Sequence, residues 1–214
     1  MDAKTPAKAP TREESTAHFK KLGATMEERP DGLWMSLKFK EGVTETDMAF
    51  FRGLTHLRML DLTRTDVTDA GLESLEGCSQ LGALILDANP VTDAGLAHLA
   101  RLTRLEVLRL IDTKVTGTGL IHLKDLKSLN SLNLAGTKIT DEGMVFLKDL
   151  KQLETLFLYE TRITDAGIAH LAGMPKLREI DLHLSHATDE GVAKLKKALP
   201  QATITSYALK GSDD

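Results

Sequence analysis

The apolar residues of this chain recur at a fixed spacing of 24 residues over most of its length. The phrase Val-Thr-Asp-Ala-Gly-Leu occupies residues 67–72 and returns unchanged at 91–96. Related phrases follow without any insertion and begin at Val115, Ile139, Ile163 and Ala187. A fixed period of roughly 20–50 residues is the signature of a repeat architecture. The pattern therefore predicts six stacked copies of one unit over residues 57–200.

Each unit combines two kinds of apolar spacing. Aligned on the phrase, it reads L-x-x-L-x-L-x-x-T-x-[VI]-T-D-x-G-L-x-x-L-x-x-L-x-x. The L-x-L part alternates with a period of two, which predicts a short strand, and the later leucines at a spacing of three predict a short helix. One unit cannot bury both apolar faces, but stacked units can, with a parallel sheet on one side and helices on the other. Because the strand side is the shorter one, the strands are expected to line a concave face.

This unit resembles the leucine-rich repeat family, in a variant similar to repeats common in bacterial proteins and to the cysteine-containing type of F-box adaptors. The six strict copies cover about two-thirds of the chain. The resemblance implies an α/β fold, a right-handed leucine-rich-repeat solenoid (horseshoe) with parallel strands on the concave face and short helices on the convex face. It also implies a protein- or peptide-binding role.

The two ends of the array are predicted to carry caps, because a solenoid exposes an apolar cross-section at each end. Residues 1–10 are expected to be a disordered tail, and residues 11–56 an N-terminal cap. The cap begins with a helix opened by Thr11 and Glu14, which have the spacing of a capping box. Residues 201–214 are expected to form a last strand and a tail.

The rest of the N-terminal cap is predicted to hold a hairpin and a degenerate repeat. The turn Arg29-Pro30-Asp31-Gly32 separates a short strand over 24–28 from an alternating strand over 33–39. The helix half of a degenerate repeat follows, with apolar residues at Val43, Met48, Phe51 and Leu54.

The polar residues that recur from copy to copy are interpreted as structural. Thr is a good N-cap residue and Asp in the first turn suits the helix dipole, so we expect the Thr-Asp pairs to cap helices rather than to bind metal. Five of the six copies have the Asp: Asp69, Asp93, Asp141, Asp165 and Asp189. Copy three has Gly117-Thr118-Gly119 instead, so Thr116 is expected to cap alone at the weakest helix start. Small polar residues at the turn after each strand are expected to satisfy backbone groups: Thr65, Asn89, Thr113, Thr137, Thr161 and Ser185.

Composition and motifs exclude several classes of function. The net charge of −4 argues against binding to nucleic acid, and no apolar run is long enough to span a membrane. Cys78, the one cysteine, falls in a helix position filled by Leu in other copies, so we interpret it as a core residue. His98, His122 and His170 share one helix position without further ligands, and no nucleophile-base motif is present, so we expect no metal, cofactor or catalysis. A monomer is expected. The polar N-terminus fits a cytoplasmic protein or one exported with its signal removed.

The residues between the inward leucines are predicted to face solvent on the concave sheet, and they do not repeat. Positions that the scaffold does not fix are free to recognise a ligand, and apolar, aromatic and Arg side chains are favoured at interfaces. We predict that a partner contacts Ile85, Asp87, Val107, Arg109, Ile111, Asn133, Phe157, Tyr159, Asp181 and His183. Stabilisation of the sheet by cross-strand pairs is the alternative reading of the same residues.

The sequence thus predicts a non-catalytic module that binds a protein or peptide on its concave face. Two alternatives stay open: a substrate-recognition arm of a ubiquitin-ligase or effector type, and a structural fragment of a larger envelope protein. A second candidate surface is a basic row at one turn position: Lys114, Lys138, Arg162 and His186. Asp112 and Glu160 lie two residues before Lys114 and Arg162, which favours local ion pairs over a binding role for this row.

Overall fold

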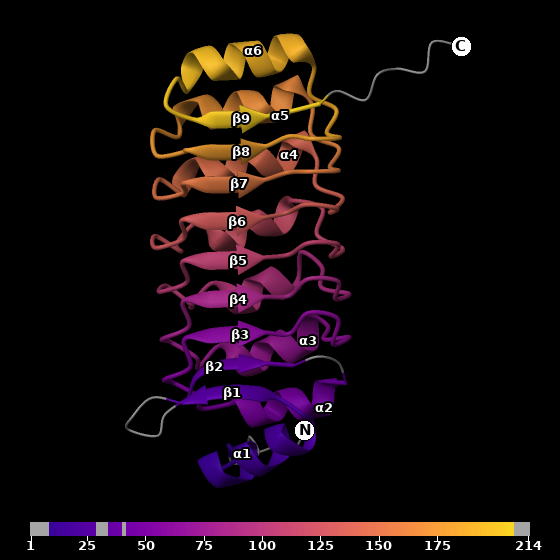
Figure 1. Ribbon diagram of the computed structural model, residues 1–214, viewed down its shortest axis with the longest axis vertical. Helices are drawn as coiled ribbons and strands as arrows, with labels where there is room; N and C mark the ends of the chain where they lie inside the picture. The colour runs from indigo at the N-terminus through magenta and orange to yellow at the C-terminus, as the bar shows by residue number, and fades with distance from the viewer. Residues whose placement is uncertain (1–8, 29–33, 40–41, 208–214) are drawn as a thin grey trace, which may run out of the picture.

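A computed structural model describes residues 9–28, 34–39 and 42–207, and shows one elongated stack of strand–helix units (Figure 1). The strands of this described part form a single nine-stranded sheet in chain order. The first two, β1 (Thr25–Glu28) and β2 (Trp34–Lys38), pair antiparallel, and every later neighbour pairs parallel. The later strands are β3 (Met59–Asp61), β4 (Ala83–Ile85), β5 (Val107–Arg109), β6 (Ser131–Asn133), β7 (Thr155–Phe157), β8 (Glu179–Asp181) and β9 (Thr203–Thr205).

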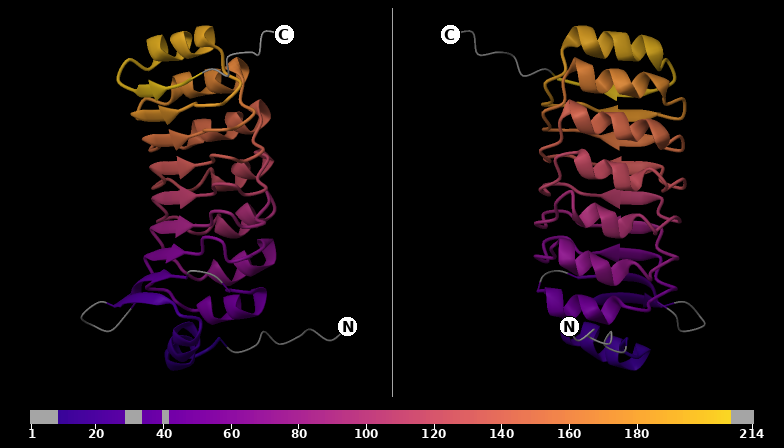
Figure 2. Two further views of the ribbon diagram at one scale, coloured as in Figure 1. Left: turned by 45° about the vertical axis from the view of Figure 1, so that its right-hand side comes forward. Right: turned by 180° about the vertical axis from the view of Figure 1, so that it is seen from behind.

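The helices lie on the opposite side of the stack from the sheet (Figure 2). The α-helices are α1 (Arg12–Lys21), α2 (Glu45–Met48), α3 (Asp69–Leu72), α4 (Asp141–Met144), α5 (Asp165–Ala169) and α6 (Asp189–Ala198). The 3₁₀ helices are η1 (Ala49–Phe51), η2 (Glu73–Leu75), η3 (Gly95–Leu99), η4 (Thr118–Leu123), η5 (Val145–Asp149) and η6 (His170–Gly173). Below, "concave face" means the solvent-facing side of the sheet, and "convex side" means the helix side.

The predicted short helices of the inner repeats are largely 3₁₀ helices. The reason is the spacing of three between Leu96, Leu99 and Leu102, because three residues per turn place all of them on one face. All three are fully buried. The last helix, α6, is a regular α-helix whose buried apolar residues are Val192 and Leu195.

One aliphatic core runs between sheet and helices from the N-terminal cap to the last strand. The inward residues Leu84 and Leu86 of copy two are fully buried, as are their equivalents in most of the other copies. Cys78 belongs to this core: its sulfur lies 3.6 Å from the carbonyl oxygen of Phe51, and burial raises the pKa of its thiol to about 12. The prediction that Cys78 is a core residue is confirmed.

The N-terminal cap closes the core with aromatic side chains. Helix α1 has the predicted capping box, in which Thr11 and Glu14 bond each other's backbone. Phe19 from this helix is fully buried, with ring-centroid distances of 5.4 Å to Phe39 and 4.8 Å to Phe51. The predicted strands on either side of the hairpin are present as β1 and β2, whereas the turn at 29–32 lies outside the described residues.

A left-handed backbone turn recurs at the same place in all six copies. It lies one residue before the buried polar turn position, with φ values of 53–66° at Arg64, Ala88, Asp112, Gly136, Glu160 and Leu184. Only Gly136 has a residue type that adopts this conformation without strain. The side chains at this position share no property, so the sequence pattern did not indicate it.

Candidate binding surface

The buried polar turn residues satisfy backbone groups, as predicted. Thr113, Thr137 and Thr161 are buried, and each donates its hydroxyl to the carbonyl oxygen three residues earlier, at 2.6–2.7 Å. These side chains connect the end of one strand to the turn that follows it. They are therefore part of the scaffold and not of a site.

Asn89 serves two neighbouring turns at once. Its Oδ1 accepts from Thr65 N at 3.2 Å, from Thr65 Oγ1 at 3.3 Å and from Val67 N at 3.0 Å. Its Nδ2 donates to the carbonyl oxygens of Leu62 at 2.7 Å, Leu86 at 3.0 Å and Asp87 at 3.2 Å. The amide therefore ties the first repeat to the second through buried hydrogen bonds.

The recurrent aspartates lie in the first turn of most of their helices, as predicted, but their carboxylates bond to the next repeat. Asp69 accepts from the backbone N of Thr92 at 2.8 Å and from its hydroxyl at 2.5 Å. Asp141 makes the same pair of bonds to Thr164, at 2.8 and 2.5 Å. The Thr hydroxyl caps its own helix at Thr164 and Thr188, as predicted, but not at Thr68 or Thr140. Its donation to a carboxylate 23 residues earlier is the more regular contact.

The glycine of the repeated phrase makes room for this carboxylate. A Cβ built on Gly95 would come closer than 3.0 Å to the Asp69 carboxylate, and one on Gly167 equally close to Asp141. Thr, Asp and Gly of the repeated phrase thus form one contact that joins consecutive repeats, referred to below as the Thr–Asp–Gly contact. This contact between repeats explains why the phrase recurs along the array.

Between copies three and four a direct backbone contact replaces the Thr–Asp–Gly contact. Thr116 donates its hydroxyl to Asp93, so the prediction that it caps its helix alone is wrong. Gly117 stands where the other copies have Asp, and adopts a φ of 117°. A Cβ on Gly143 would lie 2.6 Å from the Cα of Gly117, so the two backbones touch directly. Thr140 N donates instead to the carbonyl oxygen of Thr116 at 3.2 Å.

The carboxylates of Asp93 and Asp165, which bond to the following repeat, lead to a prediction about acid stability. Burial alone would raise the pKa of Asp93, but hydrogen bonds from Thr116, Gly117 and neighbouring groups outweigh it and lower that pKa. Hydrogen bonds from Thr188 lower the pKa of Asp165. A carboxyl with a lowered folded-state pKa stabilises the fold above its unfolded pKa of about 3.9, and this is lost as the pH falls through the folded value.

We therefore expect the melting temperature to be nearly constant from about pH 7 to 5 and to fall below about pH 4. Circular-dichroism melts across this range measure it. Asp165→Asn should show a smaller acid-induced fall than the wild type, because it removes one of the contributing groups. A wild-type melting temperature that stays level down to pH 3 would show that protonation of Asp93 and Asp165 does not change the stability of the fold.

The strand register arranges the concave face in columns that cross the repeats. Two residues beyond the strand ends, the turns of neighbouring repeats are still linked by backbone hydrogen bonds, such as the one from Gly136 N to Tyr159 O. The middle column holds Asp61, Ile85, Arg109, Asn133, Phe157, Asp181 and Thr205. The column beyond the strand ends holds Thr63, Asp87, Ile111, Ala135, Tyr159, His183 and Tyr207.

The N-terminal half of this face is an apolar surface around one oriented guanidinium. Ile85, Val107 and Ile111 are all partly exposed. Arg109 lies among them, and its Nη2 contacts Asp87 Oδ2 at 2.5 Å. The other oxygen of Asp87 accepts from the backbone N of Ile111 at 3.1 Å. Asp87 therefore fixes the position of Arg109, whose Nε is buried and has no hydrogen-bond partner.

The C-terminal half is aromatic. Phe157 is partly exposed and Tyr159 is 39% exposed. His183 stacks on Tyr207, with ring centroids 4.6 Å apart and an angle of 29° between the rings. Tyr207 was not among the predicted contact residues, although it lies 24 residues after His183 and so in the same column. Its exposure of 74% makes it the most exposed of the large hydrophobic residues in the described part.

Some predicted contact residues use their polar atoms within the fold. Asn133 Oδ1 accepts from the backbone N of Ala135 at 3.0 Å. Asp181 Oδ1 accepts from His183 N at 2.9 Å and contacts His183 Nδ1 at 2.5 Å. With Asp87, these groups orient the turns beside the face.

The basic row and the remaining histidines show no ligand-binding arrangement. Lys114 and Arg162 are exposed, and their predicted pairs with Asp112 and Glu160 do not form within the described ranges. His98 contacts Glu76 at 2.8 Å. No group of three or more metal-ligating side chains occurs among the residues with described positions.

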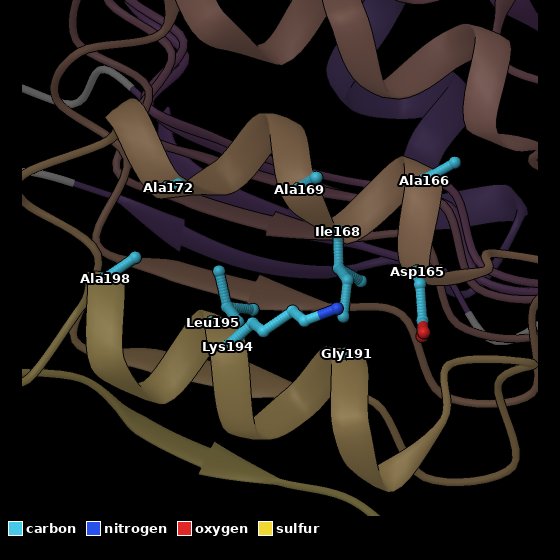
Figure 3. Close-up of a pocket in the computed structure, with 9 residues that line it drawn as sticks. All are labelled: Asp165, Ala166, Ile168, Ala169, Ala172, Gly191, Lys194, Leu195 and Ala198. Carbon is cyan, nitrogen blue, oxygen red and sulfur yellow. The ribbon is translucent and has the colours of Figure 1, made fainter.

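The convex side carries one apolar groove, which the sequence did not indicate. It lies between α5 and α6, has a volume of about 460 Å³, and is crossed by the side chain of Lys194 (Figure 3). The groove exists because Ala169 and Ala172 stand where copy four has Val145 and Lys148. Lys194 pairs with Glu190 at 2.7 Å and lies near the groove wall.

Comparisons with known proteins agree with this architecture. A profile of the leucine-rich repeat family matches residues 53–75 and 125–148. Internalin InlF of Listeria monocytogenes superposes with a TM-score of 0.65 at 22% identity, over 81% of this chain and 47% of that one. Internalin C2 of the same species gives 0.54 at 26% identity, over 79% of this chain and 80% of that one. A search of curated sequences finds no match.

A third similar structure is the ectodomain of the receptor kinase GASSHO1/SCHENGEN3 from Arabidopsis thaliana in complex with Casparian strip integrity factor 2. It has a TM-score of 0.56 and 21% identity, and covers 81% of this chain and 21% of that one. The chain thus spans about half the length of InlF and a fifth of the receptor ectodomain. Repeat, fold and profile together identify it as a leucine-rich-repeat protein. No helix in the described ranges is long and apolar enough to cross a membrane.

Proposed function

We propose that the chain is a non-catalytic module that binds a protein or peptide on its concave face. The observation that carries this is the contrast between two sets of residues. The recurrent polar side chains are engaged within and between repeats, whereas the non-repeating concave side chains leave apolar and aromatic surface in solvent. Such surface marks an interaction site when it is contiguous. The proposed contacts are Ile85, Val107, Arg109, Ile111, Phe157, Tyr159 and His183, oriented by Asp87, Asn133 and Asp181.

The arrangement fits an extended chain that crosses the strands. Neighbouring strands lie roughly 4.8 Å apart, so the five steps from β4 to β9 span about 24 Å. About seven extended residues cover that length. Arg109 would anchor one half of the ligand through hydrogen bonds, and the aromatic side chains would anchor the other half. Arg and Tyr are enriched among residues that dominate binding energy.

The surrounding fold supports a binding role rather than catalysis. The one thiol is buried in the core, and Asp87 is occupied by the backbone N of Ile111 and by Arg109. A similar receptor ectodomain was solved with a bound factor, which is consistent with this use of the fold. A ligase-type recognition arm and an envelope fragment are alternatives that differ in the identity of the partner.

Affinity capture from the native organism tests the proposal. Arg109→Ala combined with Phe157→Ala should weaken capture of the specific partner by at least about 30-fold, since two interface anchors are removed. Ile121→Ala, on the convex side, is the control. Both proteins should keep a melting curve close to that of the wild type. If the double variant captures the same partner as strongly as the control does, the concave face is not the binding surface.

A further inference from the structure

We propose that the C-terminal half of the concave face recognises a cationic segment of its partner, an extended stretch that carries Lys or Arg. This inference rests on the proposed function, because it assigns a ligand chemistry to part of the same face. The surface consists of Glu179, Asp181, His183 and Tyr207, with Tyr159 beside them.

Two carboxylates on the N-terminal half of the face, those of Asp61 and Asp87, are already neutralised. Asp61 contacts Lys38 Nζ at 2.9 Å, and Asp87 contacts Arg109 Nη2 at 2.5 Å. Each of these carboxylates is almost fully buried beneath its cation. Neither of these two carboxylates has a free negative charge to offer a ligand.

The carboxylates on β8 have no such cation. Glu179 is exposed, and its neighbours across the sheet are Thr155 on β7 and Thr203 on β9. Asp181 faces Phe157 and Thr205 and contacts only His183 among basic groups. In the part of the chain with described positions, neither carboxylate pairs with Lys or Arg. Glu179 and the Oδ2 oxygen of Asp181, for which the described residues provide no hydrogen-bond donor, are therefore available to a ligand on this side.

Aromatic rings stand next to Asp181. The stacked pair of His183 and Tyr207 lies in the column that adjoins Asp181, with Tyr207 74% exposed, and Glu179 lies in the column on the other side of Asp181. A guanidinium or ammonium group over a Tyr face is attracted by the ring electrons, and a carboxylate beside it adds a charge-assisted hydrogen bond. The combination is specific for cations, because an anion would be repelled by both the rings and the carboxylates.

The charge of the whole chain acts in the same direction. Its net charge of −4 favours approach of a basic partner and disfavours an acidic one. Long-range attraction is not confined to one surface, so the experiment has to separate it from local recognition.

The probe is a fluorescent eight-residue peptide of alternating Arg and Gly, compared by anisotropy with a Glu-Gly peptide at low ionic strength. The basic peptide should bind and the acidic one should not. Glu179→Gln with Asp181→Asn should weaken binding at least about tenfold. Tyr207→Ala should weaken it by about threefold to tenfold. Asn at 181 keeps the turn acceptor, as Asn133 does at the equivalent position of copy four.

The matched control is Glu73→Gln with Glu142→Gln, which changes the net charge equally at exposed positions on the convex side. It should leave binding within about twofold of the wild type. Equal losses in both double variants, or equal binding of both peptides, overturn the proposal.

Failure of the proposed function gives a different result. In that case the native partner is insensitive to Arg109→Ala with Phe157→Ala, whatever the basic peptide does. If instead the native partner needs Arg109 and Phe157 but not Glu179 and Asp181, the binding function stands and the cationic segment is refuted.

Discussion

Replacing Asn89 by Ala is expected to lower the free energy of unfolding by about 4 kcal/mol, because it leaves several buried backbone groups without partners. The amide accepts three hydrogen bonds and donates three, all within the turns of the first two repeats. Asn89 is only 2% exposed, so water cannot replace these bonds without opening the turn. Urea unfolding followed by circular dichroism measures the loss.

The matched variant is Asn89→Thr, because Thr occupies this position in four other copies. Its hydroxyl can restore the bond to the carbonyl oxygen three residues earlier, as Thr113 does at 2.7 Å. The expected loss is then only about 1–2 kcal/mol. Equal losses for Ala and Thr would mean that the side chain's volume, and not its hydrogen bonds, holds the turn.

Gly143→Ala is expected to cost about 3 kcal/mol or more, the upper end of the range for overpacking. The new Cβ would lie 2.6 Å from the Cα of Gly117 and 3.0 Å from its carbonyl carbon and oxygen. These are backbone atoms, so no side-chain rotation can relieve the contact. The stack would have to open between copies three and four.

Gly173→Ala provides the control, since nothing lies within 4 Å of a Cβ at that glycine and its φ is not positive. Its unfolding free energy should match or slightly exceed that of the wild type, because Ala restricts the unfolded chain. Urea titrations of both variants compare the two sites. A Gly143→Ala protein as stable as the Gly173→Ala protein would contradict the close approach of the two repeats.

The repeat made the fold predictable, because each leucine position is fixed by burial in every copy. The spacing of L-x-L gave the strands, and the burial of Leu84 and Leu86 confirms it. The aspartates were harder to interpret. Thr and Asp at a helix start satisfy the rules of local capping, and only the stacking distance shows that Asp69 reaches Thr92, 23 residues later.

The sequence predicted where the candidate surface lies, but not which of its charged side chains are paired. Alternation within each strand decides which side chains face solvent, and Ile85, Phe157 and Tyr159 are partly or largely exposed as expected. The sequence pattern does not show which side chains pair across strands. It therefore did not indicate that Asp87 pairs with Arg109, or that Glu179 has no Lys or Arg partner among the described residues. The exposed position of Tyr207 follows from the period, but only when the column is continued past the last repeat.

Site-specific photocrosslinking tests the central claim most directly, by asking which face the partner touches. Tyr159 on the concave face and Ile121 on the convex side are matched in exposure, at 39% and 41%. Each is replaced in turn by a photoreactive benzoylphenylalanine, and the captured complex is irradiated. The proposed function predicts a crosslink to the partner from position 159 and none from position 121. A crosslink from position 121 alone would contradict it.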